Sequence, residues 1–257
     1  MRCDNNNLAD AIKQANKEIY NNISIESYNS NESIFNDSRK KASLNALVKA
    51  AENSGDDSYL DIATGTGNLL RLGEGVFKRV YAVDIADNLL LNIKKSFPNA
   101  YLSASDAENL PFQQNSFNCV SCYAMLHHLL EHEKLFRECH RVLKMGGTLY
   151  TDHDPNYYFN RFHRIFYRIK HGNSPGFGSD TEELAEYHNS FSSGINPESL
   201  KEKLLRIGFS SVDITYRVTD SEKFTGLAEI GRQILSAVSK ITPIKSLFTH
   251  FSIIAIK

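Results

Sequence analysis

Three aspartates, Asp61, Asp84 and Asp106, stand where short apolar runs of the sequence end. The first belongs to "YLDIATGTGNLL", in which an apolar run is followed by a turn containing Gly65 and Gly67. Glycines let the chain turn tightly and let a ligand approach the backbone closely. Asp84 ends the next apolar run, "VYAVD", about twenty residues later, where a carboxylate can accept hydrogen bonds from the two hydroxyls of a ribose. The three acids therefore indicate a nucleoside site.

The details of the glycine turn bear on which nucleoside fits. A dinucleotide site favours G-x-G-x-x-G, whose third glycine lets the helix pack closely while its N-terminus faces a pyrophosphate. Leu70 occupies that third position here, and the loop opens with an acid. An acidic loop suits a positively charged ligand, such as a sulfonium with an α-amino group, and disfavours a diphosphate. A nicotinamide dinucleotide therefore fits poorly.

A second polar cluster lies in "LYTDHDPNYYF", residues 149–159, which begins like a buried strand and reaches a proline. Imidazole and carboxylate groups can take a proton from a reacting hydroxyl or carbon acid. We expect His153 and Asp154 to be the first candidates for such a base, with His128 and His188 behind them. The alternative is that the cluster is only the polar end of a strand.

The elements that must position these residues alternate along the chain between strand and helix. Residues 38–53 show helical spacing, with an apolar face that we predict to comprise Leu44, Leu47, Val48 and Ala51. Strands are expected at 58–63, 79–85, 100–106, 117–124, 146–153, 210–218 and 247–257, and further helices at 67–76, 87–97, 132–144, 196–209 and 221–240. This order is typical of a parallel sheet covered on both faces by helices.

The ordered set of motifs resembles one known family. The segments "LDIATGTGNL", "VYAVDIADNLL", "SDAENLPFQQNSFNCVSCYAMLHHL" and "LFRECHRVLKMGGTLY" are similar to class I S-adenosylmethionine (SAM)-dependent methyltransferases, in the broad group that includes ubiquinone and menaquinone biosynthesis enzymes. The resemblance covers about residues 55–152. It implies an α/β fold: a Rossmann-like three-layer sandwich with a mostly parallel seven-stranded sheet, an antiparallel last strand and helical lid insertions.

The resemblance also implies SAM as cofactor, S-adenosylhomocysteine as product, and a set of residues that contact the cofactor. The first loop would wrap the methionine part, the second acid would hold the ribose, the third would contact the adenine, and the end of the fourth strand would lie near the methionine moiety. The matching residues are Asp61, Ala63, Gly65, Gly67, Asp84, Ile85, Asp106, Ala107 and Tyr123.

Segments outside this frame are the candidates for substrate binding. We interpret residues 1–257 as one methyltransferase domain with an N-terminal cap segment (1–36), a lid insertion (154–195) and a helical insertion before the last strand (218–246). Side chains from the cap and lid that could line a substrate pocket are Tyr28, Phe35, Tyr157, Tyr158 and His188. The sequence "DHDPN" departs from the glutamate-phenylalanine-serine run of the quinone enzymes, which weighs against a direct transfer of quinone specificity.

The composition of the sequence limits the kinds of partner that the protein is expected to bind. The formal net charge of −1 gives no general attraction to nucleic acid or anionic membranes, and no apolar run is long enough for stable membrane insertion. Cys119 and Cys122 form a C-x-x-C within a predicted strand, where positions three apart face opposite sides, so a metal or redox pair is not expected. We expect no metal site, free thiols, a cytoplasmic location and a monomer or homodimer.

The predicted reaction is methyl transfer from SAM to an oxygen, carbon or nitrogen of a small molecule of aromatic, quinone-like or secondary-metabolite type. One alternative is a catalytically inactive SAM-binding regulator or partner subunit. A less favoured one is an NAD(P)-dependent oxidoreductase. Methylation of nucleic acid or protein is disfavoured, because the sequence lacks an Asn- or Asp-Pro-Pro-aromatic motif.

Overall fold

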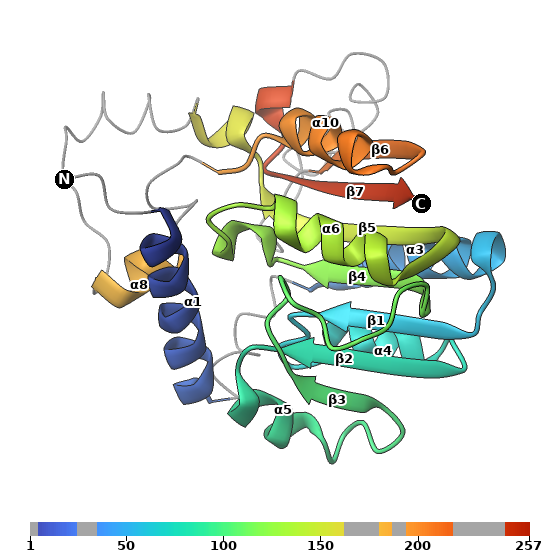
Figure 1. The fold of residues 1–257 in the computed structure, drawn as a ribbon. Helices are drawn as coiled ribbons and strands as arrows, with labels where there is room; N and C mark the ends of the chain where they lie inside the picture. Colours follow the sequence, from blue (N-terminus) through green and yellow to red (C-terminus); the bar gives the residue numbers. More distant parts are fainter. Residues whose placement is uncertain (1–4, 25–34, 162–179, 187–193, 218–244) are drawn as a thin grey trace, which may run out of the picture.

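The apolar runs of the sequence form one mixed sheet. The computed structural model describes residues 5–24, 35–161, 180–186, 194–217 and 245–257 (Figure 1). Within them, seven strands pair in the order β3-β2-β1-β4-β5-β7-β6. They are β1 (Ser58–Ile62), β2 (Arg79–Asp84), β3 (Tyr101–Ala104), β4 (Phe117–Tyr123), β5 (Leu143–Pro155), β6 (Ser211–Arg217) and β7 (His250–Ile256). Only β7 runs antiparallel to its neighbours β5 and β6, which confirms the predicted fold class.

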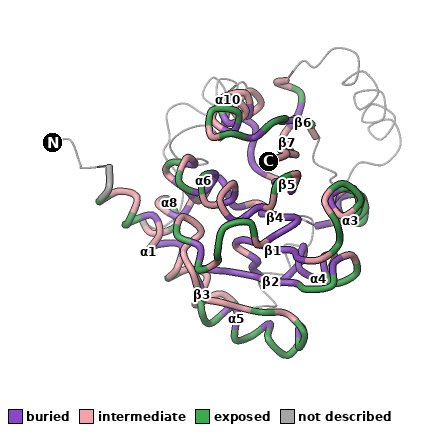
Figure 2. Tube along the Cα trace, turned by 45° about the vertical axis from the view of Figure 1, so that its right-hand side comes forward, coloured by how far each residue is buried: buried purple, intermediate pink, exposed green. Residues whose placement is uncertain are grey.

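Helices cover both faces of the sheet and make it the middle of three layers. One face packs against α3 (Asp37–Ser54), α4 (Asn68–Glu74) and α5 (Asp87–Ile93), and the other against α6 (Glu133–Val142) and α10 (Pro197–Ile207). Figure 2 shows the central strands as the buried part of the molecule, with exposed surface on the outer sides of the helices. Cys119 and Cys122 fall in the two different core clusters, so their thiols lie on opposite faces of β4 as predicted.

The buried face of α3 differs from the predicted one. Its buried residues are Arg39, Ser43, Leu47 and Ala50, whereas the side chains of Leu44 and Val48 are exposed. The apolar-periodicity prediction was therefore wrong at these two positions. Polar side chains occupy the inner face of α3 because they form hydrogen bonds with residues of the sheet. Ser43 Oγ lies 3.1 Å from the Tyr150 hydroxyl, and Arg39 Nη1 donates to His153 Nε2 at 3.1 Å.

The strand β5 continues two residues beyond the predicted end, through Pro155, because it contains a bulge. Asp152 pairs with Ser252 and Asp154 with Phe251, so His153 is an extra residue on its strand, and it has φ +69°. An inserted residue reverses the faces of the side chains that follow it. Asp152 therefore bonds to Tyr150 on one face, while Asp154 reaches His127 on the other.

The chain leaves the sheet after β5 and comes back beside the end of the same strand, at Ile195. Asn156 forms a parallel bridge with Ile195; the Ile195 amide donates to Pro155 O and the Tyr157 amide to Ile195 O, each at 2.9 Å. The Asn156 side chain is buried and donates to the carbonyls of Lys245, in the short 3-10 helix η3 (Lys245–Leu247), and of Phe248.

Helix α1 (Asn5–Asn22) crosses the end of the sheet where β1 and β2 finish, and α8 (Asp180–Ala185) packs beside it (Figure 1). Among the described helices, none combines the length and apolar character needed to cross a bilayer. The predicted helix over 221–240 lies outside the described residues.

Candidate active site

A pocket opens at the carboxyl ends of β1 to β4, where the strand order reverses between β1 and β4. Such switch points are where open α/β sheets bind ligands. The pocket is partly open to solvent, and the space between its lining residues, including the part open to solvent, is about 710 Å³. Its floor comes from the loops that follow β1, β2, β3 and β4, and its opposite wall from Lys13, Asn16 and Tyr20 of α1.

The loop after β1 is braced from beneath by Asp61. Thr64 Oγ1 donates to Asp61 Oδ2 and Ser121 Oγ donates to Asp61 Oδ1, both at 2.8 Å. Burial raises the pKa of Asp61 to about 6, against the opposing effect of these hydrogen bonds. Asp61 therefore shapes the loop, while Ala63 and Gly65, at φ +53° and +55°, line the pocket itself.

Gly67 serves the packing of the loop. It has φ +84°, and a Cβ atom there would lie 2.4 Å from the ring of Phe97. Gly67 is not among the residues that line the pocket, and its missing side chain lets the start of α4 lie against the Phe97 ring, in the segment after α5.

Asp84 lies at the end of β2 and faces the pocket with a fixed orientation. The backbone amides of Gly65 and Ala86 donate to its Oδ2 and Oδ1, each at 2.9 Å. Each carboxylate oxygen keeps a further lone pair that can accept a ligand hydroxyl. Burial raises the pKa of Asp84, because it disfavours the charged form more than the two amides restore it. Ile85 lines the pocket beside it.

Asp106 follows β3 and is tied to α1. Lys13 Nζ donates to Asp106 Oδ2 at 2.7 Å and to Glu108 Oε2 at 2.6 Å, and the Glu108 amide donates to Asp106 Oδ1 at 2.9 Å. The two carboxylates raise the pKa of Lys13 despite its partial burial. Ala107 lines the pocket next to this ion cluster.

Tyr123, at the end of β4, lines the pocket and forms one end of a stack of rings. The His153 ring lies parallel to it at 5.2 Å, and the His250 ring lies 4.1 Å beyond. Burial lowers the pKa of His153 far below its usual range. Because a guanidinium can only donate, the Arg39 bond occupies the lone pair of His153 Nε2. Within the described part of the chain, His153 does not line the pocket.

His128 instead presents a nitrogen to the pocket. It belongs to the short 3-10 helix η2 (Leu126–His128), and its Nδ1 lies 2.8 Å from the Ala185 carbonyl, which can only accept. The proton therefore sits on Nδ1, and Nε2 accepts a hydrogen bond from the Tyr20 hydroxyl at 3.2 Å. Burial, helped by the neighbouring His127, lowers the pKa of His128 to about 4. The neutral ring is thus the form present at neutral pH.

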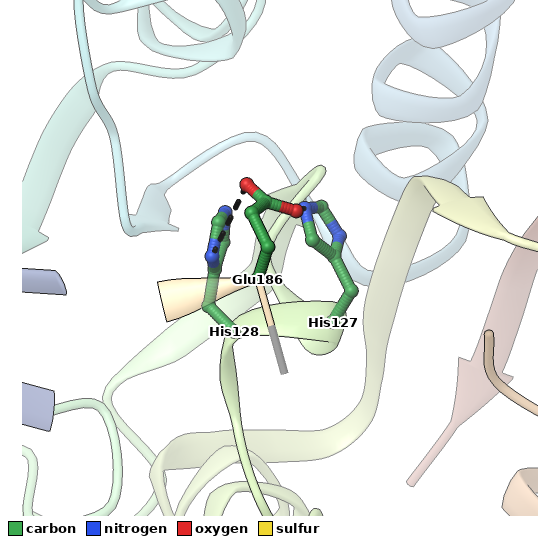
Figure 3. Close-up of side chains that lie close together, drawn as sticks. All are labelled: His127, His128 and Glu186. Carbon is green, nitrogen blue, oxygen red and sulfur yellow. Dashed lines mark ion pairs between the residues drawn. The ribbon is translucent and has the colours of Figure 1, made fainter. Parts of the chain in front are cut away.

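One group of described side chains comes close enough to hold a metal ion. His127, His128 and Glu186 each offer an atom, and these atoms lie within 4.8 Å of one another (Figure 3). The sequence prediction had no metal site. In the observed arrangement His128 Nδ1 donates to Ala185, so the nitrogen nearest Glu186 carries a proton and cannot ligate a cation.

The other predicted substrate residues are dispersed. Phe35 contacts Tyr123 edge to face at 5.0 Å and is not among the residues that line the pocket. Tyr158 donates to Asn196 Oδ1 at 3.2 Å, and Tyr157 accepts from Arg161 at 2.7 Å, both away from the pocket. Tyr28 and His188 lie outside the described residues.

Sequence reasoning missed the contribution of α1. Lys13, Asn16 and Tyr20 are spaced by three and four residues, which places them on one helical face. The signal was present as a polar and aromatic stripe, but the segment's asparagine-rich start obscured its helical pattern.

Comparisons with known proteins agree with this geometry. A methyltransferase-domain family model matches residues 60–151. The chain is 32% identical over 179 residues to the ubiquinone/menaquinone biosynthesis C-methyltransferase UbiE of Neisseria meningitidis serogroup A, covering 61% of this chain and 68% of that protein. It is also 32% identical over 103 residues to the demethylmenaquinone methyltransferase of Chlorobaculum parvum, covering 40% of this chain and 43% of the relative.

Solved structures show the same fold. Phosphoethanolamine N-methyltransferase 2 of Haemonchus contortus, in complex with SAM, superposes with a TM-score of 0.55 at 21% identity, covering 84% of this chain. This chain spans 52% of that protein. A SAM-dependent methyltransferase from Archaeoglobus fulgidus has a TM-score of 0.51 at 20% identity, covering 85% of this chain and 94% of its own.

The chain therefore belongs to the class I SAM-dependent methyltransferases. Within that class it is similar to the ubiquinone and menaquinone C-methyltransferases. It is an enzyme, and its cofactor is SAM.

The pocket fits this cofactor. SAM carries a ribose diol, an adenine amine and a cationic methionine end. Asp84 offers acceptor lone pairs for the diol, Asp106 offers a carboxylate at the neighbouring strand end, and the open backbone of Ala63 and Gly65 allows close approach. SAM supplies an electrophilic methyl group.

Proposed function

We propose that this enzyme transfers the methyl group of SAM to an oxygen, carbon or nitrogen of a small aromatic or quinone-like molecule, and that His128 takes the acceptor's proton. The observation that carries the proposal is one continuous pocket. The carboxylates of Asp84 and Asp106, at the ends of β2 and β3, line it together with Tyr20 and His128.

Tyr20 and His128 suit an acceptor with an ionisable hydroxyl. Because Tyr20 donates to His128 Nε2, the acceptor's hydroxyl can give its proton to the Tyr20 oxygen while the Tyr20 proton passes to Nε2. In the balanced step the methyl–sulfur bond breaks with its electron pair left on sulfur, the acceptor–methyl bond forms, and the proton goes to Nε2. The named relatives that act in quinone biosynthesis support this substrate class.

Helix α1 and η2 also shape the reaction by excluding water. Positioning of two reactants and removal of solvent are the main contributions an enzyme makes to an in-line methyl transfer. Met125 and Leu129 supply apolar surface next to His128, so the nitrogen works in a dry environment.

We also propose that the enzyme acts as a monomer or homodimer. The buried free thiols of Cys119, Cys122 and Cys139 suit the reducing cytoplasm, where we place the enzyme.

The proposal is tested with radiolabelled SAM and a panel of phenols, hydroquinones, amines and carbon acids. We expect a labelled product from a phenol or hydroquinone, and no product when Asp84→Ala replaces the wild type. Labelling confined to aliphatic amines would contradict the substrate class, which is aromatic or quinone-like.

A further inference from the structure

The buried histidine next to the proposed base has no part in the mechanism so far. His127 is buried in η2, and its Nδ1 lies 2.9 Å from Oδ1 of Asp154. The His127 backbone amide donates to the same oxygen at 3.2 Å. Because a carboxylate oxygen accepts, the hydrogen of His127 sits on Nδ1, and Asp154 fixes both the orientation and the tautomer of the ring.

The opposite side of the His127 ring faces the segment that follows α8. His127 Nε2 lies 3.7 Å from Oε2 of Glu186, and the other oxygen of that carboxylate lies 3.9 Å from His128 Nδ1. Figure 3 shows the carboxylate between the two imidazole rings. His128 Nδ1 also donates to the Ala185 carbonyl. His127 and His128 therefore both contact the segment formed by Ala185 and Glu186.

The charges in this group support one another. Burial opposes a charge on His127, but Asp154 and Glu186 outweigh it and raise its pKa. A proton gained by His127 would attract the Glu186 carboxylate and disfavour a charge on His128, whose ring centroid is 4.1 Å away. Asp154 itself is fully buried, and within the described residues its Oδ2 has no hydrogen-bond partner, so the His127 contact is its main compensation.

We propose that His127 is a positioning residue: held by Asp154, it keeps Glu186 and the Ala185 carbonyl against His128, which holds the His128 proton on Nδ1 and leaves Nε2 basic toward the pocket. This inference rests on the proposed role of His128 as the proton acceptor. It assigns Asp154 an indirect role, through His127, on the face opposite to Asp152.

The alternative is a cation held by His127, His128 and Glu186. It would require His128 Nδ1 to lose its proton and its bond to Ala185, and it would shift the remaining proton to Nε2, next to Tyr20. The two arrangements therefore predict opposite tautomers of His128.

Imidazole ¹⁵N NMR of the full chain with S-adenosylhomocysteine added separates them. The His128 signal, assigned with His128→Gln, is expected to show the Nδ1–H tautomer in the wild type. In His127→Gln and in Glu186→Gln we expect a mixture of tautomers. Glu182→Gln, one turn earlier in α8, is the matched control and should leave the signal unchanged.

The kinetic readout uses the acceptor found in the panel. His127→Gln should lower kcat by about tenfold, with KM and the Kd for S-adenosylhomocysteine within about twofold, as expected for a change in proton transfer and not in binding. Glu186→Gln, a partly exposed change that does not threaten the core, should act in the same direction. An unchanged tautomer and unchanged kcat in both variants would overturn the proposal.

Two other results test the cation alternative and the role of His128 as the base. Loss of activity on chelator treatment, restored by Zn²⁺ in the wild type but not in His127→Gln, would replace the proposal with a cation site. Full activity of His128→Gln would defeat the proposed base, while the NMR tautomer would still report whether His127 positions the ring.

Discussion

The Tyr20 hydroxyl lies 3.2 Å from Nε2 of His128, although 108 residues separate them in the sequence. This contact joins α1 to the loop after β4 and places a neutral imidazole beside the cofactor pocket. We expect His128→Gln to lower kcat by about 10²- to 10⁴-fold, the usual contribution of a general base. Tyr20→Phe should cost about tenfold, since Nε2 itself is kept. Single-turnover kinetics checks both, and Kd for SAM should change little.

The ribose-binding role that we propose for Asp84 predicts a loss of SAM affinity when this carboxylate is removed. Asp84→Ala should raise the Kd measured by calorimetry by more than about tenfold, because charge-assisted hydrogen bonds contribute about 1.5–3 kcal/mol. Asp87→Ala, an exposed acid three residues later in α5, is the matched control and should bind normally. Equal affinity of Asp84→Ala and wild type would refute the site assignment.

The depressed pKa of His128 predicts the acid limb of the pH profile. Burial favours the neutral ring, so proton-accepting capacity is complete at neutral pH and is lost only as pH falls through about 4. The value of kcat/KM should be level down to about pH 5 and fall by about tenfold per pH unit below 4. Unfolded histidine titrates near 6.5, so folding is also weakened as pH falls from there toward 4. Circular dichroism at each pH separates the two effects; a limb near 6.5 with intact fold would contradict the assignment.

Lys13 ties α1 to the third strand end, and its removal should loosen that helix. In Lys13→Met, Asp106 and Glu108 lose their shared cation and repel each other, so amide hydrogen exchange in α1 should accelerate. Lys17→Met provides the control, because Lys17 forms only an exposed pair with Asp87 at 3.6 Å. Equal exchange rates in the two variants would show that the ion cluster does not hold α1.

The contact between Gly67 and Phe97 predicts a difference between two glycines. Gly67→Ala should destabilise the fold by about 2–4 kcal/mol, from left-handed strain plus a clash with the ring. Gly146→Ala also has a positive φ, +75°, but nothing within 4 Å, so about 1 kcal/mol is expected. Urea unfolding of both variants measures the difference, and similar losses would exclude the steric contribution.

The sequence predicted the fold well because strand and helix periodicity follows burial. Asp84 and Asp106 could be predicted as site residues because the carboxyl ends of parallel strands meet at one edge. His153 was a different case, since the β5 bulge that turns it toward Arg39 leaves no mark in the alternation of apolar residues. The pairing of His127 with Asp154, and of Tyr20 with His128, depends on packing between segments far apart in sequence, which periodicity does not report.

The bridge between Asn156 and Ile195 has a consequence for how substrate range can change. Both ends of the intervening stretch are pinned to the same place by backbone hydrogen bonds and by the buried Asn156 amide. A change in length between these ends can leave the sheet register in place, provided that Ala185 and Glu186, which contact His128, are kept. Sequence changes between these two points can thus alter acceptor specificity while the strands that carry the cofactor loops keep their register.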